Sequence, residues 1–354
     1  MKLQLYILRT VAIQIFAAAL ILMSILQILD LLDVTSDILD RGLGVAGVAY
    51  YAALRLPRLF EQVAPISVLA GGLFAFSGLA RESAIVAMRA SGISGYRIVG
   101  MAVPAAVAVM LLDVLCAQVL APRADPALAD WWKNTTPVAE RKTPAPRTFR
   151  AGGDLVTAAQ ASADGRELSQ ITIYRRDAKG LLTEKLEAPS AQYQPGGGWM
   201  LRQPKTTRFT GEIAQTSTAD SARWPNRLNP QDVQGLFGGD ALPTAASARR
   251  ALENGGSDRP ESFYATHLQA AFANPFVALV MLLLSAPVAL ANFRSGQGAI
   301  LLTGGLAAGL LFLVANGMLT ALGESGALSP FLAVWAAPAI FGALAVRTFL
   351  ALEG

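Results

Sequence analysis

Long apolar runs occupy both ends of this 354-residue chain, and a polar region separates them. A helix needs about 20 apolar residues to cross a bilayer. Six stretches reach that length, at residues 10–33, 60–80, 97–121, 265–291, 297–322 and 328–350. The pattern predicts a membrane α-helical protein with six transmembrane helices, three before and three after an insert.

The insert has the period-two alternation that is typical of half-buried strands. The predicted strands cover residues 154–160, 169–175, 181–187, 190–194 and 199–203, with turn-forming runs at 177–180 and 195–198. Short strands joined by tight turns predict an inserted all-β domain, either a jelly roll or a small sandwich. A short helix over 243–254 should lead back to the membrane. Such a fold can hold an apolar trough or offer an edge strand to a similar domain, but a plain solvated sandwich has the same pattern.

These patterns divide the chain into three parts. Residues 1–122 form the first transmembrane half, 123–262 the jelly-roll domain, and 263–354 the second transmembrane half.

The charged residues predict the orientation of the helices. If the N-terminus is cytoplasmic, the cytoplasmic ends carry few acids, Glu82 and Glu353. They carry many bases: Lys2, Arg9, Arg81, Arg89, Arg97, Arg294 and Arg347. The positive-inside rule then places both termini in the cytoplasm and the insert on the extracytoplasmic side.

Composition excludes several classes of function. With 53% hydrophobic and 15% charged residues, the chain is too apolar for an ordinary soluble enzyme of its length. It has no compact basic stripe with interleaved aromatics, so nucleic-acid binding is not expected. It also has no glycine-rich phosphate-binding loop and no Cys/His cluster. We therefore expect no metal or cofactor in this chain, and any ATP and Mg²⁺ to be bound by a separate subunit.

Three single residues could have either a structural or a functional role. Cys116 lies in an apolar stretch, where a buried small hydrophobe is the natural interpretation. His267 is the single histidine and is more simply a packed side chain than a catalyst. Asp113 lies within the third predicted span, which makes it a candidate functional residue unless neighbouring polar groups cap it.

A short polar segment, Leu79 to Ser94, interrupts the apolar pattern between the second and third spans. On a helical wheel Arg81, Ile85, Met88 and Arg89 share one basic and apolar face. Ser83, Ala87 and Ala90 line the opposite face, and Ser91-Gly92 supplies a C-cap. This segment, about residues 80–92, is the predicted docking site for a cytoplasmic protein.

Motifs in a fixed order along the whole chain resemble those of the LptF/LptG (YjgP/YjgQ) family, permeases of lipopolysaccharide export ABC transporters, and the LptG type above all. The first half carries Leu56-Pro57-Arg58, Pro65, Met88-Arg-Ala-Ser-Gly92 and Val119-Leu-Ala-Pro122. The second half carries Ala273-Asn-Pro275, Leu284-Ser-Ala-Pro287, Phe293-Arg-Ser-Gly296 and Leu322-Gly-Glu-Ser-Gly326, followed by Pro330 and Trp335.

The resemblance implies a non-enzymatic permease that extracts lipopolysaccharide from the outer leaflet of the inner membrane and passes it to a periplasmic bridge. The implied partners are a cytoplasmic ABC ATPase dimer (LptB-like), a second permease (LptF-like), a single-span LptC-like protein and an LptA-like bridge. The implied ATPase-coupling residues are Arg81, Glu82, Ser83, Ile85, Met88, Arg89, Ser91 and Gly92.

The resemblance also implies a lateral gate between the first and fifth spans, represented by Ile28 and Ala307. Residues placed for lipid binding near this gate are Asp30, Asp33, Asp37, Arg55 and Arg58, with Arg58 favoured as the ligand of a lipid phosphate.

Two features depart from the family. Ala84 stands where relatives have a glutamate, so either the ATPase has adapted or Arg81 and Arg89 carry the docking. The carboxylates of Asp30, Asp33, Asp37 and Asp40 share a face of about 80° where relatives can have lysines. They would repel a lipid phosphate unless a divalent cation bridges, the head group differs, or Arg41, Arg55 or Arg58 pairs with them. A solvated helix end is equally compatible.

Two other functions fit parts of the pattern. A mechanotransmitting or lipoprotein-releasing ABC subunit also couples an ATPase to a periplasmic domain, but it usually has four spans with that domain after the first. A membrane scaffold that recruits partners through its β domain is the alternative from a different class.

Overall fold

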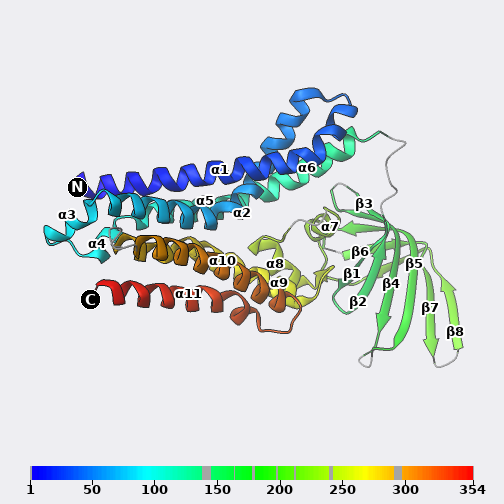
Figure 1. Cartoon of the computed structure of the whole chain (residues 1–354). Helices are drawn as coiled ribbons and strands as arrows, with labels where there is room; N and C mark the ends of the chain where they lie inside the picture. The colour runs from blue at the N-terminus through cyan, green and yellow to red at the C-terminus, as the bar shows by residue number, and fades with distance from the viewer. Residues whose placement is uncertain are drawn as a thin grey trace. The chain divides into compact units, whose positions relative to one another are not determined.

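The computed structural model describes residues 2–137, 145–162, 164–177, 180–196, 198–210, 213–238, 242–290 and 297–353. The chain forms two compact units, Met1–Leu128 with Gln269–Gly354, and Ala129–Leu268. Six helices are long and apolar enough to cross a membrane, three from each end of the chain, and they flank an antiparallel β region (Figure 1). The fold class predicted from the sequence is confirmed. The two unit boundaries fall inside helices, each six residues after the predicted domain boundary.

The helical unit is built from both ends of the chain. The first half contains α1 (Lys2–Asp40), α2 (Gly44–Arg81), α3 (Ala84–Ala90), α4 (Gly95–Gly100), α5 (Val103–Leu115), the π-helix η1 (Cys116–Leu120) and α6 (Ala121–Thr135). The second half contains α9 (Glu261–Ser285), the 3₁₀-helix η3 (Ala286–Leu290), α10 (Gln297–Glu324) and α11 (Pro330–Glu353). The second span begins far earlier than predicted, because α2 continues through Pro57 and Pro65.

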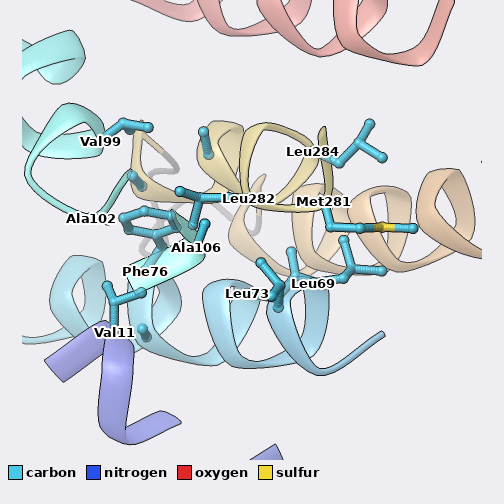
Figure 2. Close-up of a cluster of buried hydrophobic side chains, with 14 of the residues drawn as sticks. Val11, Leu69, Leu73, Phe76, Val99, Ala102, Ala106, Met281, Leu282 and Leu284 are labelled. Atoms are coloured by element: carbon cyan, nitrogen blue, oxygen red, sulfur yellow. The ribbon is translucent and has the colours of Figure 1, made fainter. Parts of the chain in front are cut away.

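Helix α2 lies at the centre of this unit. Its inner side chains, with those of α1, α4, α5 and α9, point into one apolar cluster (Figure 2). Fully buried examples are Val11, Phe76 and Met281. By contrast, little of α1 and α10 is buried in this chain. Lipid offers no hydrophobic drive between helices, so close packing of this cluster holds the unit together.

Glycines set the closest approaches to α2. A Cβ built at Gly71 would lie 2.4 Å from the Cα of Ile15, so α1 touches α2 backbone to backbone. A Cβ at Gly72 would lie 2.3 Å from Oγ of Ser285. On α10, Gly309 is seated against Leu69 and Gly305 against Leu73. Small residues therefore permit close packing at these four positions.

These contacts also fix the relative register of three helices. Ile15 lies beside Gly71, while Leu69 and Leu73 lie beside α10. Two residues on a helix differ by about 200°, so α1 and α10 pack on opposite sides of α2. Helix α10 runs antiparallel to α2, because Gly305 meets Leu73 and Gly309 meets Leu69. Helix α1 also runs antiparallel to α2, because Ile15 lies at Gly71 and Asp30 at Arg55, so α1 and α10 are parallel to each other.

The second unit is one antiparallel sheet with two helices. Its strands are β1 (Arg147–Ala151), β2 (Asp154–Ala158), β3 (Gln160–Ala161), β4 (Glu167–Arg176), β5 (Leu182–Gln194), β6 (Gly198–Arg202), β7 (Lys205–Thr210), β8 (Ile213–Thr218), β9 (Ser221–Trp224) and β10 (Gly256–Ser257). The main order is β10-β1-β2-β4-β5-β6-β9, with β3 on β4 and the β7–β8 hairpin on β5. The helices are α7 (Pro230–Phe237) and α8 (Ala245–Asn254).

Two predicted strands are in fact one. Strand β5 runs without a break from Leu182 to Gln194 and pairs with β4 from Leu182 to Gln192. Its other edge is shared, because Glu184–Glu187 pairs with β7 and Ser190–Gln194 pairs with β6. Pro189, which has no N–H to donate, lies where the sheet passes from one neighbour to the other. The predicted break at this proline was therefore wrong.

The core of this unit lies on one face of the sheet. Trp199 and Trp224 are almost fully buried, with ring centroids 6.5 Å apart. Val233 and Leu236 of α7 cover the same core. The helix α7 begins with a capping box, in which Asn229 and Asp232 bond each other's backbone N–H. The predicted helix over 243–254 is present as α8.

Candidate functional site

The segment between α2 and α4 is a broken helix, not the continuous one predicted. Helix α2 ends at Arg81, and α3 begins at Ala84. Ser83 lies between them with a φ of 57°, in the left-handed region. The predicted common face of Arg81 with Ile85 is therefore wrong, because the two residues belong to different helices.

The two apolar residues of the predicted basic and apolar face point inward. Ile85 and Met88 are buried in the core of the helical unit. Ala87 and Ala90 are exposed together with Val86 and Arg89. A helical wheel shows that Ile85 and Met88 share a face, but it does not show which way that face points. Because burial of apolar side chains is favourable, this face packs against the core. A partner reaching α3 meets small residues and one arginine.

The C-terminal end of α3 is fixed as the sequence indicates. Gly92 has a φ of 83° and its N–H bonds the carbonyl of Arg89, while the N–H of Ile93 bonds the carbonyl of Met88. This is a Schellman motif, with Ile93 and Met88 packed in the same cluster. The segment is joined to the last helix as well, since Tyr96 meets Phe349 edge-on at 5.2 Å. Helices α3 and α4 are therefore both anchored in the helical unit.

A set of ion pairs joins α1, α2 and α6 at the far end of the unit. Arg55 forms a two-pronged bond with Asp30, at 2.9 Å and 2.7 Å. Arg58 donates to Glu61 at 3.0 Å and to Asp125 at 2.7 Å. We call these five residues the ion-pair belt. The expected pairing of the acidic stripe with an arginine is confirmed for Asp30 and Arg55.

The belt marks one edge of an apolar zone. On α1 the zone runs from Arg9 to Asp30. The 20 residues between these two charges span about 30 Å of helix, the thickness of a bilayer's hydrocarbon core. The belt thus lies at the level of lipid head groups, and Arg9 at the opposite boundary.

The belt does not present the free cations expected for a lipid phosphate. Three carboxylates surround two guanidinium groups, and the side chain of Arg58 is only 16% exposed. To bind a lipid phosphate as predicted, Arg58 would first have to release Glu61 or Asp125. Asp33, Asp37 and Asp40 continue the stripe as exposed side chains beyond the belt. The pairing of Glu61 could have been predicted from its spacing of three residues from Arg58, whereas no local pattern indicates Asp125.

Two long apolar faces remain uncovered in this chain. The C-terminal half of α1 exposes a row of apolar side chains, each with half or more of its surface accessible: Ile21, Ile25, Ile28 and Leu32. Helix α10 exposes a similar row, in which Leu311, Val314 and Met318 stand out. These are the two helices that the sequence analysis assigned to a lateral gate.

Ile28 and Ala307 do not face each other in one chain. Helix α2 lies between their helices, and Ala307 is level with Ile15 because Gly305 and Gly309 flank the level of Gly71. Ile28 lies thirteen residues further along α1, about 20 Å away along the axis. A residue of α10 at the level of Ile28 is Met318 or Leu322. The predicted pairing is therefore misplaced in height.

The remaining candidates lie apart from this belt and segment. Oδ1 of Asp113 is buried and has no hydrogen-bond partner within the described ranges. Cys116 is a buried free thiol, as predicted, at the first residue of η1. His267 packs on Phe263 with ring centroids 4.4 Å apart. The motif Phe293–Gly296 and Arg294 lie outside the described residues.

Comparison with known proteins places this architecture in a family. The family profile described as lipopolysaccharide export system permease LptF/LptG matches residues 5–351. The lipopolysaccharide export system permease protein LptG of Haemophilus influenzae is 23% identical over 346 residues, covering 96% of this chain and 93% of that protein. The LptG protein of Escherichia coli K12 is 23% identical over 364 residues, covering 96% and 92%. Since the profile spans nearly the whole chain, the chain belongs to the LptF/LptG family of lipopolysaccharide export permeases.

Proposed function

We propose that the chain is a membrane subunit of an ATP-driven lipopolysaccharide exporter, in which a separate cytoplasmic ATPase dimer hydrolyses ATP. The observation that carries the proposal is the match to export permeases over residues 5–351. The six long apolar helices support a multi-pass protein of the inner membrane. The arginines at one end of these helices support cytoplasmic termini and a periplasmic β domain.

In this proposal the ATPase docks on the exposed face of α3. Val86, Ala87 and Ala90 permit close approach, and Arg89 supplies a charge. Buried Ile85 and Met88 hold the helix to the core. Arg81, Glu82, Ser83, Ser91 and Gly92 stay candidates for coupling at the two ends of α3. Ala84, which stands in place of the family's glutamate, makes an arginine-based contact the more natural one here.

The gate in this proposal forms between two subunits. Within one chain α2 separates α1 from α10, so α1 can meet only the fifth span of a second permease. Lipopolysaccharide would enter there from the outer leaflet, with acyl chains against the exposed apolar rows and the head group near the ion-pair belt. ATP-driven closure would then pass it to the β domain of one permease, an LptC-like single-span protein and an LptA-like bridge.

Reconstitution tests the proposal. The chain is placed in proteoliposomes with the second permease and the ATPase, and transfer of lipopolysaccharide to a soluble periplasmic acceptor is measured with and without ATP. We expect ATP-dependent transfer that is lost in Arg81→Ala/Arg89→Ala while the complex still assembles. Arg123→Ala is the matched control, since Arg123 is an exposed arginine of α6. Full transfer in the double variant would overturn the docking assignment, and ATP-independent transfer would overturn the transport assignment.

A cross-linking pair tests the position of the gate. Cysteines at Ile28 of this chain and at the residue of the second permease aligned with Met318 should cross-link and block transfer. The pair Ile28 with the residue aligned with Ala307 is the control, because it differs only in height along the helix. Equal cross-linking of both pairs would contradict the register.

A further inference from the structure

One cross-strand row on the inner face of the β domain is charged. Arg175 of β4 lies opposite Glu184 of β5, and Glu184 lies opposite Arg208 of β7. Both arginines donate to Glu184, at 2.6 Å and 3.0 Å. Asp154 of β2 completes the row, since it accepts from Arg175 at 3.3 Å. We call these four residues the charged row. Its signs alternate over four neighbouring strands, so each charge has a partner of the opposite sign.

The charged row lies at the boundary of the apolar core. The next row of the inner face consists of Val156, Ile173, Leu186 and Thr206, and the first three are buried in the core. A cavity of about 910 Å³ lies at this end of the domain. Its lining includes the whole charged row and also Leu186 and Trp224 of the apolar core. The charged row therefore stands where the cavity meets the core.

The indole of Trp224 joins the charged row to a distant strand. In the order of the sheet, β9 is separated from β2 by β4, β5 and β6. Four steps of about 4.8 Å would place the two strands about 19 Å apart in a flat sheet. Nε1 of Trp224 nevertheless donates to Asp154 at 2.9 Å. The sheet is therefore curled, and this bond closes its inner face from one side to the other.

Strand β9 has few other attachments to the sheet. It is four residues long and ends the main strand order, so among the described strands it pairs with β6 alone. The ring of Trp224 is 1% exposed, whereas the side chain of Asp154 is 14% exposed at the edge of the core. Short edge strands with few contacts are the parts of a sheet that open at the lowest free energy. The bond to Asp154 is thus well placed to hold β9 closed.

We propose that the bond between Trp224 and Asp154 is a releasable latch that closes this end of the apolar core to alkyl chains. An alkyl chain that enters the core from the cavity must pass the charged row, and it offers no hydrogen bonds in exchange. Release of Trp224 lets β9 move away from β2 while the ion pairs of the charged row stay intact. The latch lies wholly within the second unit and does not depend on the proposed transport function.

Photolabelling of the full-length chain in phosphatidylcholine nanodiscs tests the proposal. The probe is palmitic acid with a diazirine at the end of its alkyl chain, and mass spectrometry measures its initial rate of insertion into β4 and β5. Trp224→Phe keeps an aromatic ring but removes the N–H. We expect the rate to rise about tenfold or more, the factor that corresponds to losing a hydrogen bond to a charged group. Trp199→Phe is the matched control, since it removes a buried indole bond to the carbonyl of Leu228 at 2.9 Å and should leave the rate unchanged.

Variants of the acceptor separate the latch from a general loss of stability. Asp154→Ala leaves both tryptophans in place, so it tests the latch even if Trp224→Phe folds poorly, and it should raise the rate equally. The two changes combined should raise it no further, because they break the same bond. Asp154→Asn keeps an oxygen acceptor for the indole and should stay near the unmodified rate. An unchanged rate in Asp154→Ala, an equal rise in Trp199→Phe, or additive effects in the double variant would overturn the proposal.

Discussion

The two units of the chain hold their charges in opposite ways. In the helical unit the ion pairs of the belt lie at one end. Away from that end, α1 and α2 pack backbone to backbone where Gly71 meets Ile15. In the β unit, ion pairs line the interior of a cavity beside a core with two tryptophans. Uncompensated charge is expensive in hydrocarbon, so a membrane unit keeps its charges at the edges. A unit in water can place them inside, because solvent screens what the protein does not pair.

The largest expected effect comes from filling the closest helix contact. Gly71→Ala places a methyl group against the backbone of Ile15, which has no side chain to move aside. We expect a loss of stability of about 3 kcal/mol or more, at the upper end for overpacking. Gly78→Ala is the control on the same helix, since nothing lies within 4 Å of its Cβ position. The measurement is thermal unfolding of the purified chain in detergent, and equal melting of the two variants would contradict the contact.

The next largest effect should come from the ion-pair belt. Arg58→Ala leaves Glu61 and Asp125 without their shared cation in a largely buried place. We expect a loss of about 2–4 kcal/mol, as for a broken buried pair. Adding Glu61→Gln and Asp125→Asn should restore part of it, because the carboxylates then need no partner. Recovery of thermal stability in the triple variant checks this, and a triple variant as weak as Arg58→Ala would show that packing, not charge, is lost.

The corresponding change in the β unit should cost less. Glu184→Gln keeps the shape of the side chain but removes the charge that Arg175 and Arg208 share. These arginines are 39% and 75% exposed, so water can replace the lost partner. We expect a loss of about 1 kcal/mol or less. Tryptophan fluorescence during unfolding measures it, and a loss as large as that of Arg58→Ala would remove the distinction between the units.

The smallest effect concerns a single exposed turn. Asp164 accepts from Ser162 Oγ at 2.6 Å and from the N–H of Arg166 at 3.1 Å, and these bonds lower the pKa of its carboxyl below the usual range. A lowered folded pKa stabilises the fold above the unfolded pKa, and this contribution is lost as pH falls through the folded pKa. Ser162→Ala should therefore melt slightly earlier at neutral pH and equally in acid. A difference that grows toward low pH would reverse the assignment.

The apolar pattern alone predicted the fold well. The six spans and strands such as β2 and β6 follow from periods of hydrophobicity that burial imposes. Strands β7 and β8 were missed because they are rich in threonine and polar residues and have no apolar alternation. Their β-branched residues were the available signal.

The candidate site was harder to predict, because its geometry depends on contacts between distant residues. The bond from Arg58 to Asp125 joins residues 67 apart, and no local pattern encodes it. The left-handed turn at Ser83 changed the direction of the chain at a residue type that rarely adopts it. That turn separates Arg81 from the helix that carries Ile85, Met88 and Arg89, so the predicted face lost one of its four residues.

The length of the α1–α2 hairpin provides an experimental handle. Helix α1 continues for ten residues beyond Asp30, about 15 Å past the belt, before the turn at Gly42 and Gly44. No other part of the structure comes within 4 Å of the Cβ position of either glycine. A peptide tag inserted between them should be tolerated and should stand clear of the lipid. Antibody access to that tag in cells with a permeabilised outer membrane would then establish the sidedness of the chain without disturbing a single packed residue.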